Sequence, residues 1–199
     1  MNLPNQLTIS RLVMTMIFVG FAAVPAGWRY PLSFWPYELD HLLCWRFAYV
    51  LAVLAAITDF LDGYLARKLN LVTDFGKLMD PLSDKIFTVS SFVVLTAHAI
   101  VPAWVTVLIL AREFSVTGLR TMAAKSGEII AAKDTGKVKT VLQMLVLAFG
   151  GCYWVDWVEK DELGFRYLWP VILWGVVLVT IYSGVVYFWN CRRLYMKDT

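Results

Sequence analysis

The sequence predicts an all-α integral membrane protein, folded as a six-transmembrane-helix bundle. Of its 199 residues, 59% are hydrophobic, whereas a typical soluble domain is roughly 45–50% apolar. Nine Trp, nine Tyr and 12 Phe are also many for this length, and membrane proteins place such rings at the lipid–water boundary. A soluble protein of this size would have to expose much of that apolar surface to water.

Six stretches approach the roughly 17–25 mostly apolar residues that a membrane-crossing helix requires. They are 8–27, 42–61, 82–100, 103–122, 138–157 and 167–189, with longer connections at 62–81 and 123–137. The first stretch also loosely imitates a signal peptide, but it has the length of a transmembrane helix. No repeat or low-complexity segment marks a second domain, so we expect residues 1–199 to form one membrane domain.

Each stretch has its own signal in the sequence. The first is an apolar run that follows Arg11, and the second ends in Asp59. The third begins near Asp84, and the fourth follows Pro102 and carries Arg112 about ten residues inside. The fifth begins after Gly136 and Lys137, and the sixth is recognised by its hydrophobicity alone.

The distribution of Lys and Arg predicts the orientation of these helices, because cytoplasmic connections are enriched in both residues. With the N-terminus inside, most basic residues lie on inner segments, and the connection at 158–166 is acidic. We therefore expect both termini and the 62–81 connection to be cytoplasmic. The net charge of only +3 does not suggest a nucleic-acid partner. The three cysteines and two histidines form no disulfide framework or zinc signature.

Four carboxylates mark the connection between the second and third helices. At about 100° per residue, Asp59 and Asp62 share one helix face, and so do Asp80 and Asp84. Acids are costly near hydrocarbon and repel one another, and divalent cations relieve both costs. Hard oxygen ligands suit Mg²⁺, Mn²⁺ or Ca²⁺, and four carboxylates suffice for two metals about 3.5–4 Å apart. The alternative is a solvated acidic rim, with Asp80 as an N-cap before Pro81.

Small and basic residues accompany these acids. Gly63, Ala66 and Gly76 allow a close approach of backbone or ligand, and Arg67 supplies a fixed positive charge for phosphate. Together they describe a pocket for a nucleotide diphosphate.

This pattern resembles the signature of the CDP-alcohol phosphatidyltransferase family, Asp59-x-x-Asp62-Gly63-x-x-Ala66-Arg67-x8-Gly76-x-x-x-Asp80-x-x-x-Asp84. The resemblance implies a six-helix membrane bundle, a homodimer and two divalent ions, Mg²⁺ or Mn²⁺. It also implies Asp59, Asp62 and Asp80 as main metal ligands, with Asp84 close to the metals and acting as the general base. The implied CDP-binding residues are Asp62, Gly63, Ala66, Arg67 and Gly76.

Three further stretches, 3–11, 111–120 and 136–140, resemble the bacterial branch whose donor is CDP-diacylglycerol and whose acceptor is glycerol 3-phosphate. This implies a multi-pass protein of the bacterial inner membrane. A cationic pocket for the acceptor phosphate agrees with it, formed by Arg112, Arg120, Lys137 and Lys139. For Arg112, an internal ion pair with Glu113 or with the carboxylate cluster is the alternative.

Other functions remain open from the sequence. Inositol phosphate is the main competing acceptor, because a phosphate pocket alone does not separate the two. An aspartate-rich membrane prenyltransferase also binds diphosphate, but usually has more helices and different Asp spacing. A cation transporter explains the acids and leaves Arg67, Arg112 and Arg120 unexplained.

Overall fold

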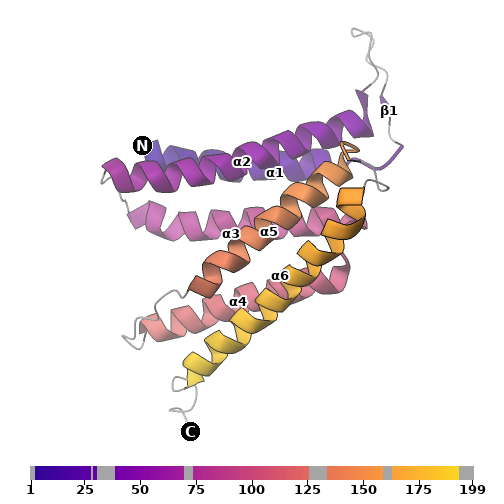
Figure 1. The fold of residues 1–199 in the computed structure, drawn as a ribbon. Helices are drawn as coiled ribbons and strands as arrows, with labels where there is room; N and C mark the ends of the chain where they lie inside the picture. The colour runs from indigo at the N-terminus through magenta and orange to yellow at the C-terminus, as the bar shows by residue number, and fades with distance from the viewer. Residues whose placement is uncertain are drawn as a thin grey trace. The chain divides into compact units, whose positions relative to one another are not determined.

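The computed structural model describes residues 3–27, 29–30, 39–69, 74–125, 134–158 and 163–192. For some of these, including 59–69, 74–78 and 134–137, it describes the backbone alone. Within these ranges the chain forms six α-helices and one two-stranded hairpin (Figure 1). The elements are α1 (Leu3–Ala22), β1 (Arg29–Tyr30), β2 (Leu39–Asp40), α2 (His41–Leu69), α3 (Asp74–Ala97), α4 (Ala103–Lys125), α5 (Asp134–Trp154) and α6 (Leu163–Asn190).

The predicted helical fold and its six helices are confirmed within the described residues. The short hairpin was not predicted. Its strands are antiparallel, with Arg29 opposite Asp40. Asp40 also begins α2, because its Oδ1 atom accepts a hydrogen bond of 2.8 Å from the backbone N–H of Leu43. This is the N-cap arrangement, in which a side-chain oxygen satisfies a backbone donor of the first turn.

The predicted connection at 62–81 is wrong. Helix α2 continues to Leu69, and α3 begins at Asp74, so Pro81 lies inside α3 and Asp80 does not cap it. The prediction ended the second helix where apolar residues end. A helix continues through polar residues with good helix propensity, as Arg67 and Lys68 are. The other helices differ from the predicted ranges by a few residues at their ends.

The chain divides into two compact units. The first unit is Met1–His98 with Gly151–Trp157, and the second is Ala99–Gly150 with Val158–Thr199. In the first unit, α1 packs against both α2 and α3. In the second unit, α4 packs against α6. The single domain expected for residues 1–199 stays a prediction.

Helix α1 buries several polar residues inside the first unit and exposes large apolar residues outside it. Its buried face consists of side chains three or four positions apart, Thr8, Arg11, Thr15, Phe18 and Ala22. Val13 and Met16 are 51% and 59% exposed. This pattern is the reverse of a water-soluble helix, whose apolar stripe faces the core. It suits a helix whose outer face meets lipid.

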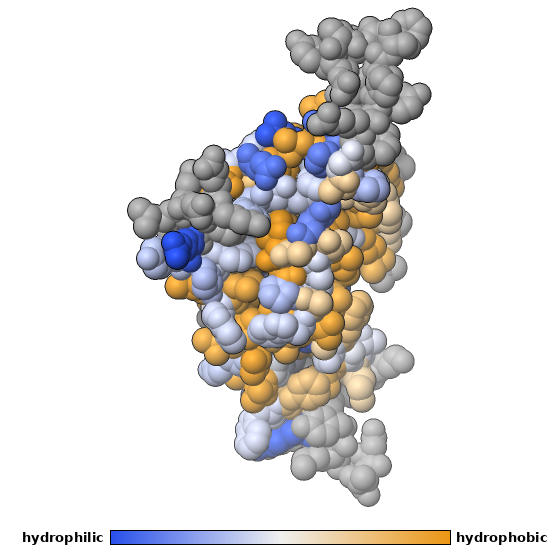
Figure 2. Space-filling view, turned by 90° about the vertical axis from the view of Figure 1, so that its right-hand side faces the viewer, coloured by the Kyte–Doolittle hydropathy of each residue, from blue (hydrophilic) through white to orange (hydrophobic). Residues whose placement is uncertain are grey.

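Apolar residues are also exposed on other helices, and hydrophobic areas are broad on the face drawn in Figure 2. In the described part of the chain, two helical segments are long and apolar enough to cross a membrane, His41–Thr58 and Arg166–Asn190. Thr8–Ala22 and Val138–Trp154 are shorter apolar segments.

Among the described glycines, Gly151 near the end of α5 has the least room for a side chain. The neighbour that limits this room is the ring of Tyr49 on α2. A Cβ added at Gly151 would lie 2.1 Å from Cε2 of Tyr49. The Tyr49 ring is held on two sides, because its hydroxyl lies 3.3 Å from the Cys152 sulfur and its ring centroid 5.5 Å from that of Trp157. Only glycine therefore fits at position 151 without moving this ring.

We predict that Gly151→Ala destabilises the protein by about 1–3 kcal/mol, the usual cost of an overpacked contact. Thermal unfolding in detergent measures this as a lower Tm. Gly20→Ala is the matched control, because a Cβ there meets nothing within 4 Å. Tyr49→Ala should remove most of the effect of Gly151→Ala when the two are combined. Equal Tm values for the two glycine variants would contradict the predicted clash.

Candidate functional site

The acidic signature lies on two helices of the first unit that contact each other, α2 and α3. Because α2 continues to Leu69, all of its signature positions are helical, and the spacing places 59, 62, 63, 66 and 67 on one face. Gly76, Asp80 and Asp84 follow one another at intervals of four residues along α3. Four signature side chains lie outside the described part of the chain, those of Asp59, Asp62, Ala66 and Arg67. The contacts around Gly63 and Gly76 lie outside it as well.

Helix α1 supplies polar partners to the acidic end of α3. Thr8 donates a 2.5 Å hydrogen bond from Oγ1 to Oδ1 of Asp80. One turn further, Nη1 of Arg11 donates to Oγ of Ser83 at 3.1 Å. Thr8, Arg11 and Ser83 are each about 1% exposed. The carboxylate of Asp80 is therefore oriented by a buried hydroxyl from another helix.

These residues fit a divalent ion in chemistry. Asp80 and Asp84 are one turn apart on α3, are partly exposed and offer hard carboxylate oxygens. Among the described side chains, no three His, Cys, Asp or Glu residues form a metal-binding group. Two of the four predicted ligands, Asp59 and Asp62, fall outside that part of the chain. The predicted metal site stays a prediction.

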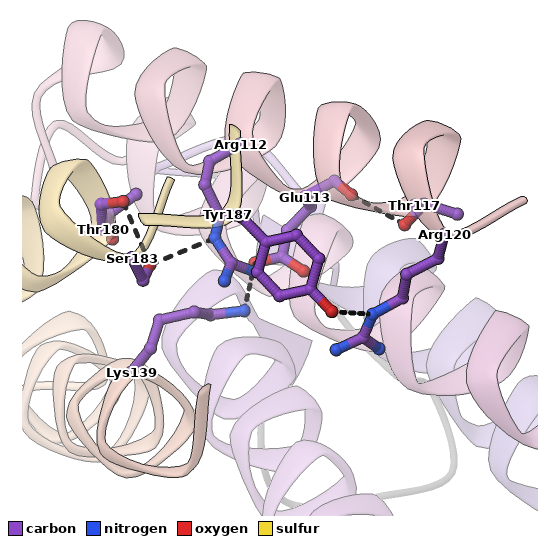
Figure 3. Close-up of polar contacts among 8 residues, drawn as sticks. All are labelled: Arg112, Glu113, Thr117, Arg120, Lys139, Thr180, Ser183 and Tyr187. Atoms are coloured by element: carbon purple, nitrogen blue, oxygen red, sulfur yellow. Dashed lines mark hydrogen bonds and ion pairs between the residues drawn. The ribbon is translucent and has the colours of Figure 1, made fainter. Parts of the chain in front are cut away.

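A second polar cluster lies in the second unit, around Glu113 of α4 (Figure 3). Oε1 of Glu113 accepts from Nη1 of Arg112 at 3.3 Å and is in direct contact with Nζ of Lys139 from α5. The side chains of Arg112, Glu113 and Lys139 are 11%, 14% and 9% exposed. Two buried cations thus share one carboxylate oxygen, and the ion pair with Glu113 that was the alternative for Arg112 is present.

Helix α6 completes this cluster. Oγ of Ser183 accepts a hydrogen bond of 3.2 Å from Nε of Arg112. The hydroxyl of Tyr187 accepts one of 2.7 Å from Nε of Arg120, and the Arg120 guanidinium carbon lies 5.3 Å from the Tyr187 ring centroid. Figure 3 shows Arg112, Arg120 and Lys139 turned toward the space between α4, α5 and α6. These cations outnumber the carboxylate among them, which favours an anion.

The structure brings together three of the four predicted phosphate-binding residues, Arg112, Arg120 and Lys139. The side chain of Lys137, the fourth, lies outside the described residues. Sequence reasoning missed their partners Ser183 and Tyr187, because α6 was recognised by hydrophobicity alone. The available signal was the polar stripe Thr180–Ser183–Tyr187, spaced by three and four residues in an apolar helix. Thr8 was also missed, although it belongs to a stretch that carried the resemblance.

Comparisons with known proteins agree with the signature. A family model described as CDP-alcohol phosphatidyltransferase matches residues 1–182. A protein of Bacillus subtilis (strain 168) is 36% identical over 188 residues, which cover 94% of this chain and 93% of that protein. Its name is CDP-diacylglycerol–glycerol-3-phosphate 3-phosphatidyltransferase.

Two other bacteria have similar proteins with the same name. The one from Rickettsia bellii (strain RML369-C) is 37% identical over 196 residues, covering 98% of this chain and 97% of its own. The one from Shigella flexneri is 30% identical over 191 residues, covering 94% and 92%. The similarity therefore extends over nearly the whole chain, including α6.

We predict that Glu113→Ala destabilises the protein by about 3–5 kcal/mol, because it removes the carboxylate that two buried cations share. Glu113→Gln should cost less, since the amide oxygen still accepts a hydrogen bond. The Tm in detergent measures both. Asp156→Asn is the matched acid-to-amide control at an exposed position. If Glu113→Ala unfolds at the wild-type temperature, the ion pair does not stabilise the second unit.

Proposed function

This chain belongs to the CDP-alcohol phosphatidyltransferase family, and we propose that it transfers the phosphatidyl group of CDP-diacylglycerol to glycerol 3-phosphate. The products are phosphatidylglycerol phosphate and CMP. The names of the bacterial relatives support both substrates. The observation that carries the choice of acceptor is the cluster of Arg112, Arg120 and Lys139, which suits the phosphate of a phosphorylated alcohol.

The donor is assigned to the first unit. Asp59, Asp62, Asp80 and Asp84 would hold divalent ions, two of them and either Mg²⁺ or Mn²⁺, as the family membership supports. When bound, such ions neutralise the diphosphate and stabilise the negative charge that develops on the leaving group. The remaining signature residues would line the CDP pocket, namely Gly63, Ala66, Arg67 and Gly76. Thr8 keeps the Asp80 carboxylate in one orientation through its hydrogen bond.

The reaction is a displacement at phosphorus. Asp84 takes the proton from the primary hydroxyl of glycerol 3-phosphate as that oxygen bonds to the β-phosphorus of CDP-diacylglycerol. The bond between the β-phosphorus and the bridging oxygen breaks, and CMP leaves with the electron pair. Arg67 stabilises its charge. No covalent enzyme intermediate is required.

The acceptor phosphate is assigned to Arg112, Arg120, Lys137 and Lys139. Arg112 and Lys139 are already close together through Glu113. Buried cations interact with an anion more strongly than exposed ones, because little water screens them. Ethanolamine is a cation and serine is a zwitterion without net charge, so neither would bring this cluster the net negative charge of a phosphate.

The protein acts in the membrane under this proposal. The acyl chains of its donor require lipid, and the exposed apolar faces of α1 and α6 suit it. We further propose that the chain crosses the bacterial inner membrane six times, with both termini and the site on the cytoplasmic side. We also propose that it forms a homodimer. Membership of one family over residues 1–182 supports a single domain.

The proposed function is tested by a panel of acceptors. Purified protein is incubated with CDP-diacylglycerol, Mg²⁺ and either glycerol 3-phosphate, inositol phosphate or serine, and CMP release is measured. We expect release with glycerol 3-phosphate only, and none without an acceptor. Equal release with inositol phosphate would move the protein to a sister activity. Release with serine alone would overturn the assigned phosphate pocket.

Asp84→Asn tests the general base. Loss of a general base typically costs about 10²–10⁴-fold in rate, so kcat should fall by that range. Mn²⁺ binding, measured separately by electron paramagnetic resonance, shows whether the ions still bind. Asp156→Asn again serves as the matched control and should keep wild-type kcat. Near-normal turnover of Asp84→Asn with intact Mn²⁺ binding would show that another group takes the proton.

A further inference from the structure

We propose that α6 contributes two positioning residues to the acceptor site. Ser183 orients Arg112, and Tyr187 orients Arg120, so that the two arginines of α4 are held ready for the acceptor phosphate. This inference rests on the proposed function, because it concerns how the same cationic cluster recognises its substrate. It adds a role for α6, the helix whose sequence reads as a plain apolar span.

Ser183 is placed to fix the Arg112 side chain. It is 1% exposed, and its hydroxyl donates to the backbone oxygen of Thr180 at 3.1 Å while accepting from Nε of Arg112 at 3.2 Å. Donation to the backbone sets the direction of the Ser183 lone pairs. The guanidinium is then held through Nε by Ser183 and through Nη1 by Glu113. These two bonds use two of the five N–H donors of an arginine and define the plane of the group.

Tyr187 is placed to fix Arg120 in a different way. Its ring is buried in an apolar cluster with Val116, Leu119 and Cys191, so the phenol has one orientation. The hydroxyl accepts from Nε of Arg120, and the ring lies beside the guanidinium. Arg120 itself is exposed. A long exposed side chain samples many rotamers, and a buried tyrosine that binds its inner nitrogen restricts them.

Because Glu113 already accepts from Nη1 of Arg112, the described contacts leave Nη2 of Arg112 and both Nη groups of Arg120 for an anion. Both arginines are bound through Nε, the nitrogen nearest the backbone. Bidentate recognition of phosphate uses parallel N–H groups of the guanidinium fork, and the fork is more effective when it is already oriented. Ser183 and Tyr187 are one turn apart on α6, so one face of this helix serves both arginines.

Tyr187→Phe tests the inference, because phenylalanine keeps the ring in its apolar cluster and removes only the hydroxyl. We expect the KM for glycerol 3-phosphate to rise about tenfold, the usual effect of losing one hydrogen bond to a charged group. The KM for CDP-diacylglycerol and kcat should stay near wild type, since the lost interaction serves acceptor binding. Tyr182→Phe is the matched control on the same helix, at a residue that is 60% exposed.

A double-variant cycle separates positioning from a general structural role. If Tyr187 acts through Arg120, then adding Tyr187→Phe to Arg120→Gln should raise the KM for glycerol 3-phosphate no further. Ser183→Ala combined with Arg112→Gln provides the same test for the other pair. Effects that simply multiply, or a rise in the KM for both substrates, would overturn the inference.

Failure of the inference is distinguishable from failure of the proposed function. If the wild type releases CMP with glycerol 3-phosphate and Tyr187→Phe matches it in every constant, only the positioning role is wrong. If the wild type gives no release with glycerol 3-phosphate, the proposed function itself is wrong. The Tm of each variant, compared with that of Tyr182→Phe, shows whether a changed KM reflects unfolding.

Discussion

Polar side chains buried between helices with apolar outer faces are the constraint on which the rest of this structure depends. Under the proposed membrane topology, an unsatisfied polar group in hydrocarbon costs several kcal/mol, which favours partners within the protein. In the first unit, Thr8 and Arg11 meet Asp80 and Ser83. Packing of α1 against α3 therefore includes specific polar pairs in addition to apolar contacts. The same pairs orient a carboxylate that the family signature marks as functional.

In the second unit, the polar side chains that need partners are charged. The side chains of Arg112 and Lys139 are largely shielded from solvent, and Glu113 provides both with a counter-ion. Among the described side chains of this cluster, one carboxylate stands against Arg112, Lys139 and Arg120, which is an excess of positive charge. An acceptor phosphate carries nearly two negative charges. Under the proposed function, Glu113 stabilises the helices before the acceptor binds, and the excess of positive charge attracts the acceptor.

Much of this was predictable where the information is local in sequence. Asp59 to Asp84 form a signature because each residue is recognised by its spacing from the next, and six helices follow from hydropathy. The ends of α2 and α3 were not predictable in this way, since hydropathy reports contact with lipid and not backbone hydrogen bonding. The partners Thr8, Ser183 and Tyr187 were missed for another reason. Their contacts join residues 67 to 72 positions apart, and a hydroxyl in an apolar helix does not specify its partner.

Donor and acceptor chemistry are thereby carried by different helices under the proposed function. The signature on α2 and α3 concerns the CDP-linked donor, which a family of CDP-alcohol phosphatidyltransferases has in common. The arginines of α4 and the hydroxyls of α6 concern the acceptor. A change of acceptor then requires no change in the acids that perform the displacement. Ser183 and Tyr187 contact the arginines, so under our proposal substitutions at these two positions should alter the affinity for a phosphorylated alcohol and leave the displacement at phosphorus intact.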